Sequence, residues 1–286
     1  MNYNQITIGI VSYKSEKVIF NCLKSIKKIK KIIILDNSND LILKKKILRK
    51  YPNIKVYLSK KNIGYGLGNN IILKKSKTPF VFILSPDVIL NKNCEKNLLE
   101  AINNLNKNFS ILSPISNDKN YGTKIEKGLI KKKTFEVEFV KGFAMLFNKK
   151  KIIDIGMFDK KIFLYLEDID LCKRLKMAKE KIYISRFSKV SHLGAKSSAI
   201  GFEYEKCRNW HWMWSKVYFE KKFSNIFYVY FKFFFMLIFQ LFKILYYSIV
   251  SNQIKKTIYS MRFSGTYNSL IGRKSWYRPK KNKIIN

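Results

Sequence analysis

The chain has 286 residues, of which 47% are apolar, so it is long enough to bury a core and is not a disordered protein. Lys and Arg number 57 against 19 Asp and Glu, which gives a formal net charge of +38. This excess predicts a polyanionic neighbour: a nucleic acid, an anionic membrane or a phosphate-rich substrate. Only seven of the 57 are Arg, the residue best suited to reading bases, which argues against sequence-specific DNA binding.

The cysteines are too far apart in sequence to form a CxxC pair, and they stand at positions Cys22, Cys94, Cys172 and Cys207. With only two histidines in the chain, a structural zinc site is not expected. We interpret the thiols as reduced and the compartment as cytoplasmic. The first residues lack a basic stretch followed by a long apolar one, which predicts that they are not a secretory signal.

Residues 6–115 alternate between short apolar runs and stretches with helical spacing. The apolar runs predict strands at 6–11, 32–35, 54–58, 80–84 and 111–112. The stretches with helical spacing lie at 15–29, 41–50, 69–75 and 94–105. Strands that alternate with helices predict an α/β fold with a mostly parallel sheet covered on both faces. In such sheets ligands bind at the carboxyl ends of the strands.

A polar, lysine-rich stretch at 116–141 is interpreted as a loop that enters a second half of the domain. The elements predicted after it are an apolar run at 139–147, a short helix at 149–155, a helix at 169–178 and a strand at 182–185. Together with the first half, they predict a single domain over residues 1–224.

From residue 225 the chain becomes apolar and aromatic, and Lys232 and Lys243 are the only charges within 226–249. At 100° per residue these lysines and Gln240 form one narrow polar stripe on a helix. The longest uncharged stretch is shorter than the roughly 20 residues that a lipid span needs. The pattern indicates a helix in the membrane interface with snorkelling lysines, or alternatively a buried core or dimer helix.

The tail from Lys255 to Asn286 is basic and aromatic, which fits an anionic lipid surface. We therefore predict that residues 225–286 form a hydrophobic and basic helical appendage that associates with membranes. This predicts a peripheral protein on the inner face of the cytoplasmic membrane.

Two acidic strand ends are candidates for ligand binding. Asp87 follows the fourth predicted strand after Ser85-Pro86, where a carboxylate can hold a divalent cation against a diphosphate. Asp36, followed by Asn37, ends the second strand, where an acidic group can accept hydrogen bonds from a base or ribose. An ordinary turn or a helix N-cap would give the same pattern at either position.

A glycine-rich stretch at 61–70 leads into a predicted helix. Its glycines, Gly64, Gly66 and Gly68, would let backbone N–H groups approach a phosphate or a nucleoside. Their spacing matches neither GxGxxG nor the Walker A pattern, so this stretch alone is a weak indication of nucleotide binding.

The most informative stretch is Glu167-Asp168-Ile169-Asp170, with three carboxylates in four residues before a predicted helix. Carboxylates that close raise one another's pKa, which suits a general base for a hydroxyl proton. The alternative is that they only complement the positive end of the helix. His192 follows a strand and is a candidate third ligand for a metal or diphosphate, although a lone histidine is more often structural.

Taken together and in this order, these elements resemble family 2 glycosyltransferases of the GT-A fold, particularly the rhamnosyltransferase-like branch. The matching segments span about two hundred residues and are IGIVSYKS at 8–15, ILDNSN at 34–39, KNIGYGLGNN at 61–70, FILSPDV at 82–88, VKGFAMLFNKK at 140–150, IGMFDKKIFLYLEDIDLCKRL at 155–175 and VSHLGAKSS at 190–198. The resemblance does not cover the residues after about 225.

The resemblance implies a GT-A, Rossmann-like domain that transfers a sugar, with inversion, from a nucleotide-diphosphate donor to a hydroxyl of a surface polysaccharide or a lipid-linked glycan. For the rhamnosyltransferase-like branch the sugar would be rhamnose. Donor-binding residues carried over from the family are Tyr13, Asp36, Asn37, Gly64 and Asn69.

Metal and base are also implied by the resemblance. Asp87 would hold Mg²⁺ or Mn²⁺ on the diphosphate, and His192 would face the metal. Asp168 would take the proton from the attacking hydroxyl, with Glu167 beside it. The family motif often has a second acidic residue or Asn where this chain has Ser85, so the donor diphosphate would supply most of the metal ligands.

Two other functions compete with this interpretation. The charge and the many aromatic residues would suit a basic nucleic-acid-binding protein, but the sequence has no RNP1, KH or helix-turn-helix signature, so nucleic acid is not an expected partner. A sugar nucleotidyltransferase would carry a glycine-rich signature with Arg and Lys near residue 12, where this chain has Ser12-Tyr13-Lys14. The partners expected are therefore the donor, a glycan or polyprenyl-linked acceptor, and an anionic membrane surface.

Overall fold

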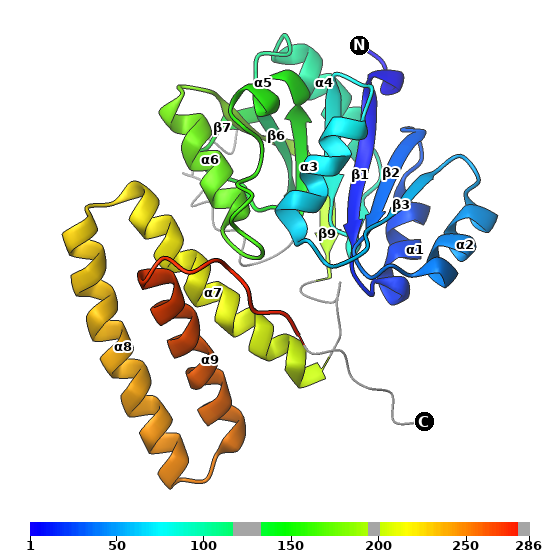
Figure 1. Cartoon of the computed structure of the whole chain (residues 1–286). Coiled ribbons are helices and arrows are strands. Elements are labelled where there is room, and N and C mark those ends of the chain that lie inside the picture. The colour runs from blue at the N-terminus through cyan, green and yellow to red at the C-terminus, as the bar shows by residue number, and fades with distance from the viewer. Residues whose placement is uncertain (117–132, 194–200, 280–286) are drawn as a thin grey trace. The chain divides into compact units, whose positions relative to one another are not determined.

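A computed structural model describes residues 1–116, 133–193 and 201–279. The chain divides into two compact units. The sheet unit comprises Met1–Asp159 and Glu167–Ala199, and the helical unit comprises Lys160–Leu166 and Ile200–Asn286 (Figure 1). The chain thus leaves the sheet unit for seven residues and returns to it at Glu167.

The sheet unit is built on one sheet of nine strands. The strands are β1 (Ile6–Ser12), β2 (Lys31–Asp36), β3 (Lys55–Leu58), β4 (Phe80–Leu84), β5 (Val88–Leu90), β6 (Ile111–Ser116), β7 (Thr134–Glu136), β8 (Ala144–Asn148) and β9 (Ile182–His192). Their order is β3-β2-β1-β4-β8-β6-β9-β5, and β7 also pairs with β9. Strands β1 to β4 pair in parallel, whereas β8 runs antiparallel to both β4 and β6. The carboxyl ends of β1, β2 and β4 therefore meet at one edge.

Helices cover both faces of this sheet, as the strand–helix alternation predicts. The helices are η1 (Tyr3–Gln5), α1 (Glu16–Ser25), α2 (Leu41–Lys50), α3 (Tyr65–Lys75), α4 (Cys94–Asn104), α5 (Lys149–Asp154) and α6 (Glu167–Met177). Alternate residues of each central strand point to opposite faces, so Phe82 packs with α1, α2 and α4, while Ile83 packs with α3, α5 and α6. The predicted α/β fold is confirmed, with a sheet that is mixed in its second half.

The lysine-rich stretch at 116–141 lies largely outside the described residues, which omit 117–132. Within the part that is described, Thr134–Glu136 forms β7 rather than a loop. Residues 194–198 of the VSHLGAKSS segment and the end of the basic tail from 280 also lie outside the described residues.

The helical unit consists of three helices, α7 (Gly201–Phe223), α8 (Ile226–Ile249) and α9 (Gln253–Leu270), within the part of the chain that the structure describes. Helix α9 packs on both α7 and α8. The boundary predicted at residue 225 falls between α7 and α8, whereas the compact helical unit includes α7. The division into 1–224 and 225–286 stays a prediction.

Two of the three residues of the polar stripe of α8, Lys232 and Gln240, contact the other helices of the unit, so at Lys232 an ion pair within the protein takes the place of the expected snorkelling. Gln240 is buried and donates to the hydroxyl of Thr266 on α9. Lys232 pairs with Glu220 of α7 at 2.7 Å. The stripe therefore stabilises the packing of α8 within the protein, and the aromatic positions of the helix are the ones left exposed.

All four cysteines are free and buried. Burial raises the pKa of the Cys22, Cys94, Cys172 and Cys207 thiols to about 12. These thiols are neutral near pH 7, which makes them poor nucleophiles and poor metal ligands.

Candidate active site

The carboxyl ends of β1 and β2 are joined through Asp36, which is 2% exposed. Ser12 at the end of β1 donates to its Oδ1 at 2.7 Å, and Ser38 donates to the same oxygen at 2.8 Å. The backbone N–H of Asp40 donates to Oδ2 at 2.9 Å. Both oxygens of Asp36 thus bond to the protein, and the residue holds the two loops in place.

Two predicted donor-binding residues lie on or beside these loops. Tyr13 is half-buried in the loop after β1, and its ring lies under the ammonium group of Lys14 at 6.0 Å. Asn37 is 3% exposed, and its Nδ2 donates to the carbonyl of Gly64 at 3.1 Å. The structure therefore brings the second strand end and the glycine-rich segment together.

Gly64 is the residue from which α3 begins, and its φ of 90° is a conformation that favours glycine. Asn69, one turn into the helix, is fully buried, and neither its Oδ1 nor its Nδ2 has a hydrogen-bond partner among the described residues. The donor-binding roles of these residues stay predictions.

The third strand end brings Asp87 and His192 together. Asp87 is 2% exposed, and its Oδ2 lies 3.5 Å from Nε2 of His192. The contact follows from strand pairing, because β5 is antiparallel to the end of β9 and places Val88 opposite His192. The His192 ring also stacks on Phe143, with ring centroids 4.4 Å apart. An acidic residue and a histidine that are far apart in sequence thus form one polar pair.

The predicted base Asp168 contacts Gly142, the residue before Phe143. Its Oδ2 accepts a hydrogen bond from the backbone N–H of Gly142 at 2.7 Å. A Cβ on Gly142 would lie 3.2 Å from that oxygen, so only glycine allows this close approach without a shift. Phe143, the next residue, contacts His192 and accepts from the backbone N–H of Ser85 at 2.8 Å.

Gly142–Phe143 therefore links the two acidic groups that the sequence places in different halves of the chain. Consecutive Cα atoms are about 3.8 Å apart, so Asp168 and the Asp87–His192 pair are attached to adjacent residues of one segment. Tyr65 also contacts this segment, because its hydroxyl donates to the carbonyl of Gly142.

Burial and mutual repulsion set the charge of the two adjacent carboxyls. The pKa of Glu167 is raised to about 8. Burial is the main cause, and the negative charge of the neighbouring Asp168 adds to it. Burial also raises the pKa of Asp168, although the N–H groups of Gly142 and Ile169 oppose the change. Near neutral pH, Glu167 is protonated and Asp168 is the group that more readily carries the negative charge.

Asp170 anchors the helix that carries these carboxyls. Its side chain is fully buried and accepts from Nε of Arg174 at 2.8 Å. The same guanidinium donates to the carbonyls of Ile155 and Met157 at 2.7 and 2.5 Å. The start of α6 is thereby fixed against the preceding turn, which positions Asp168.

The residues at the third strand end fit a divalent cation that is shared with a diphosphate. Among residues 1–116, 133–193 and 201–279, no group of three His, Cys, Asp or Glu side chains could hold a metal. Asp87 and His192 supply one carboxylate oxygen and one imidazole nitrogen, a donor set that suits Mn²⁺. Such a pair fits metals that bind through one or two protein ligands plus substrate phosphates.

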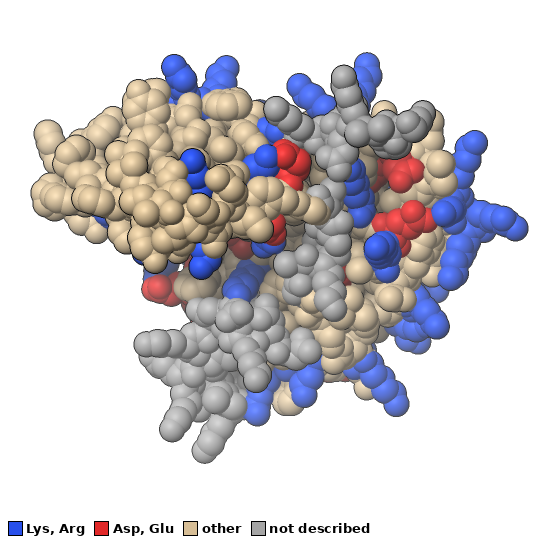
Figure 2. All heavy atoms as spheres, turned by 90° about the horizontal axis from the view of Figure 1, so that it is seen from below, with Lys and Arg blue, Asp and Glu red and all other residues tan. Residues whose placement is uncertain are grey.

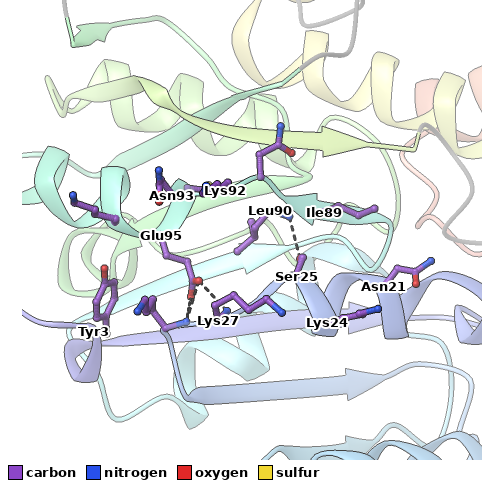
Figure 3. A pocket seen from close by; sticks show the side chains of 14 residues that line it. Tyr3, Asn21, Lys24, Ser25, Lys27, Ile89, Leu90, Lys92, Asn93 and Glu95 are labelled. Atoms are coloured by element: carbon purple, nitrogen blue, oxygen red, sulfur yellow. Dashed lines mark hydrogen bonds between the residues drawn. The ribbon is translucent and has the colours of Figure 1, made fainter.

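A separate hollow of about 910 Å³ lies between α1 and the β5–α4 segment (Figure 3). Its rim carries several lysines, including Lys24, Lys27 and Lys92. Glu95 accepts hydrogen bonds from the backbone N–H groups of Lys27, Lys28 and Ile29. Its carboxylate therefore holds the turn after α1, and none of the predicted site residues lines the hollow.

Three residues of the site are not among the sequence-based candidates: Gly142, Phe143 and Tyr65. All three lie within segments that carry the family resemblance, VKGFAMLFNKK and KNIGYGLGNN. No local pattern marks them, because their contribution is a backbone approach, a ring stack and a hydroxyl bridge that exist only after folding.

The model for the family described as Glycosyl transferase family 2 matches residues 7–169, which is more than half of the chain. The chain belongs to this family. It is therefore a glycosyltransferase, and the resemblance found in the sequence is confirmed. This family match contains β1 to β8 and ends at Asp168 and Ile169.

Two characterised relatives and one solved structure are similar to this glycosyltransferase. Rhamnosyltransferase WbbL of Escherichia coli K12 is 26% identical over 213 residues, which are 63% of this chain and 78% of WbbL. The low-salt glycan biosynthesis hexosyltransferase Agl10 of Haloferax volcanii is 28% identical over 192 residues, 60% of this chain and 61% of Agl10. Agl10 is thus matched over about three fifths of its length.

Mannosyltransferase PcManGT from Pyrobaculum calidifontis, solved in complex with GDP-Man and Mn²⁺, has the same fold with a TM-score of 0.59. The superposition covers 93% of this chain and 87% of that chain at 10% identity. At this identity the likeness establishes the GT-A fold and nothing finer.

Proposed function

We propose that this enzyme is an inverting glycosyltransferase that transfers a sugar from a nucleoside-diphosphate donor to a hydroxyl of a cell-surface polysaccharide or lipid-linked glycan. The observation that carries the proposal is the Gly142–Phe143 segment: the Gly142 N–H binds Asp168, and the Phe143 ring stacks on His192, which contacts Asp87. Similarity to WbbL makes rhamnose the first donor sugar to test.

Asp168 is proposed to accept the proton of the attacking hydroxyl. Its Oδ2 is oriented by the Gly142 N–H, and the anchored α6 keeps the carboxylate in place. Glu167 stays protonated beside it near neutral pH, so only one negative charge has to be accommodated in this buried pair. Inversion requires the base and the leaving group on opposite sides of the sugar, so the acceptor hydroxyl would bind at Asp168 and the diphosphate at the Asp87–His192 pair.

Asp87 and His192 are proposed to hold Mg²⁺ or Mn²⁺ together with the donor diphosphate. When bound, the ion would neutralise charge on the departing nucleoside diphosphate. Phe143 stacks on the imidazole and fixes the ring orientation. PcManGT, the neighbour solved with GDP-Man and Mn²⁺, supports this choice of donor class and metal.

The nucleoside of the donor is proposed to lie against the loops at the ends of β1 and β2. Tyr13 offers a partly exposed ring beside this edge. Asp36 and Asn37 hold the edge in shape through their bonds to Ser12 and Gly64, and the buried Asn69 has an amide without a hydrogen-bond partner among the described residues.

A calorimetric donor screen tests the proposal with uridine, thymidine and guanosine diphosphate sugars, with and without Mn²⁺. We expect one donor to bind and Mn²⁺ to tighten its binding. Asp87→Asn and His192→Ala should each reduce the Mn²⁺-dependent gain by roughly tenfold or more. The matched control is Asp154→Asn, which changes an exposed carboxylate on α5. Wild-type Mn²⁺ dependence in both site variants would contradict the metal assignment.

We further propose that the enzyme is peripheral to an anionic membrane, through α8. This is the one helix among the described residues that is long and apolar enough to cross a membrane. Its exposed aromatic side chains include Phe227, Phe231 and Phe242 at 81, 66 and 66% exposure. In Figure 2 a broad uncharged area, drawn in tan, lies over the helical unit and is interrupted by a few Lys and Arg side chains.

The orientation of α8 within its unit supports a helix that lies along the membrane surface. One side of the helix contacts α9 through Gln240 and α7 through Lys232. A helix surrounded by lipid on all sides would lose both contacts. The opposite side is aromatic and exposed along its whole length. A helix with one protein-bound face and one apolar face buries the latter in the interface. The basic side chains of the unit, such as Lys222 and Lys255, favour anionic lipids.

A further inference from the structure

Residues 160–166 directly precede Glu167 and Asp168 of the candidate active site in the chain. This short segment belongs to the helical unit, although its neighbours on both sides belong to the sheet unit. Its last two residues, Tyr165 and Leu166, have φ values of 70° and 64°. Two successive non-glycine residues in this left-handed region are strained, so their surroundings must hold them there.

Helix α7 supplies the first set of contacts to this segment. The hydroxyl of Ser215 donates to the carbonyl of Leu164 at 2.8 Å. Nε of Arg208 donates to the hydroxyl of Tyr165 at 2.6 Å, so the side chain of a strained residue is fixed at its far end.

The second set of contacts comes from the C-terminal strap, which we define as residues 273–279. The guanidinium of Arg278 lies 3.5 Å above the ring of Phe163. Ser275 donates to the carbonyl of Lys161 at 3.1 Å. The strap has no helix or strand of its own, so these contacts and its bonds to α7 define its path.

The strap is itself held on α7 through two aromatic side chains. Trp214 donates from Nε1 to the carbonyl of Arg273 at 2.9 Å. His211 lies 2.8 Å from the carbonyl of Tyr277, and burial lowers the pKa of His211 to about 3. The imidazole is therefore neutral at physiological pH and donates one N–H to that carbonyl without becoming a buried charge.

We infer that the C-terminal strap is a positioning element of the transferase reaction, which holds residues 160–166 in the strained turn that delivers Glu167 and Asp168. The inference rests on the proposed role of Asp168. It gives residues 273–279 a catalytic purpose separate from membrane attachment. Arg278 is the positioning residue whose side chain makes the contact with Phe163.

The test compares Arg278→Ala with Arg273→Ala in the full chain. Both substitutions remove one exposed cation from the strap, but Arg273 contributes only its carbonyl to the contacts described, and alanine keeps that group. Hydrogen exchange is followed in peptides that cover 160–168 and, separately, in peptides from β1 and β4. Donor affinity is measured by calorimetry, and turnover as release of nucleoside diphosphate.

For Arg278→Ala we expect at least tenfold faster exchange at 160–168, unchanged exchange in β1 and β4, donor affinity within twofold of wild type, and turnover reduced at least tenfold. Arg278→Lys should show exchange and turnover between those of wild type and Arg278→Ala, because it keeps the cation and loses the planar face. Arg273→Ala should match wild type. Unchanged exchange at 160–168, or faster exchange with wild-type turnover, would overturn the inference.

Phe163→Leu is the second variant, in case Arg278→Ala lowers the melting temperature of the whole chain. It keeps an apolar side chain at a position that is 5% exposed and removes the ring face under the guanidinium. The same local rise in exchange is expected. The exchange measurement does not depend on which carboxylate is the base, so an error in the role of Asp168 would leave it unchanged and alter only the turnover result.

Discussion

In the sheet unit the acidic groups of the candidate site are buried, whereas in the helical unit large apolar side chains are exposed to solvent. Asp87 is 2% exposed and Glu167 is 7% exposed. Phe227 and Ile249 on α8 are 81 and 82% exposed. Each arrangement is costly in water by itself, so each indicates a partner that has to compensate for it.

The buried acids of one unit and the exposed apolar side chains of the other therefore require different binding partners. The buried acids of the sheet unit call for cations and hydroxyl protons, which fits a donor diphosphate with a metal and an acceptor alcohol. The exposed rings of the helical unit call for an apolar phase. Changes in the first unit should then affect chemistry with or without lipid, and changes on α8 should affect lipid binding alone.

Asp168→Asn should have the largest effect on the chemistry of the sheet unit. The amide keeps the acceptor oxygen for Gly142 but cannot take up a proton, so transfer should fall roughly 10²- to 10⁴-fold. Donor affinity should stay within a few fold of wild type. The rate of nucleoside diphosphate release measures transfer, with Asp154→Asn as the control. An Asp168→Asn variant as fast as wild type would show that Asp168 is not the base.

Arg174→Ala should have the next largest effect, on stability. It leaves the fully buried Asp170 carboxylate without its guanidinium, a change that costs about 3–5 kcal/mol in typical buried pairs. Chemical denaturation of the full chain measures the loss. The matched control is Lys176→Ala on the same helix, which breaks only an exposed pair with Glu138 and should change little. Equal stability of the two variants would show that α6 is not anchored by this contact.

The double variant Phe231→Ser with Phe242→Ser should weaken binding to anionic vesicles by roughly tenfold or more, because two exposed rings no longer enter the lipid. Flotation with phosphatidylserine-containing vesicles measures this, and turnover of a soluble donor should be unchanged. Ile42→Ser is the control, since Ile42 on α2 is equally exposed at 67%. If the wild-type chain stays in the soluble fraction and sediments as a dimer, the exposed face binds a second copy and the lipid proposal fails.

Glu167→Gln should have the smallest effect, and one that depends on pH. The folded-state pKa of Glu167 is raised to about 8, so the folded chain binds more protons than the unfolded chain between about pH 4.5 and 8. Stability from this group is thus present at low pH and is lost as the pH rises through 8. The glutamine variant should match wild type at pH 5 and melt higher at pH 8.5, by about 2–4 °C per kcal/mol relieved.

The control for that titration is Glu100→Gln, which changes an exposed carboxylate on α4. It should leave the pH dependence of the melting temperature as it is in wild type. A Glu167→Gln curve parallel to wild type from pH 5 to 8.5 would mean that Glu167 is charged in the folded chain at neutral pH.

Much of the sheet unit could be predicted because its strands and helices have strong local patterns. The helix predicted at 41–50 is α2, and the strand predicted at 80–84 is β4. Strands β5 and β7 were not predicted, because three residues show no periodicity and both depend on pairing with β9. The order of β8 in the sheet is likewise a tertiary property.

The sequence predicted the site residues whose side-chain chemistry is unusual, and it did not predict those that act through the backbone or through contacts formed on folding. Asp168 and Asp87 stand out as acids in a basic chain. The role of Gly142 depends on a contact between residues 26 apart, and that of Phe143 on a stack with His192. On α8 the sequence located the polar stripe correctly but could not say which side of the helix faces the protein.

The burial of all four cysteines makes the wild-type enzyme a convenient background for thiol labelling. With each thiol enclosed and its pKa raised to about 12, a maleimide should leave Cys22, Cys94, Cys172 and Cys207 unmodified. A single cysteine introduced by Phe227→Cys would then be the only reactive site. An environment-sensitive fluorophore attached there would report directly whether that end of α8 enters a lipid phase.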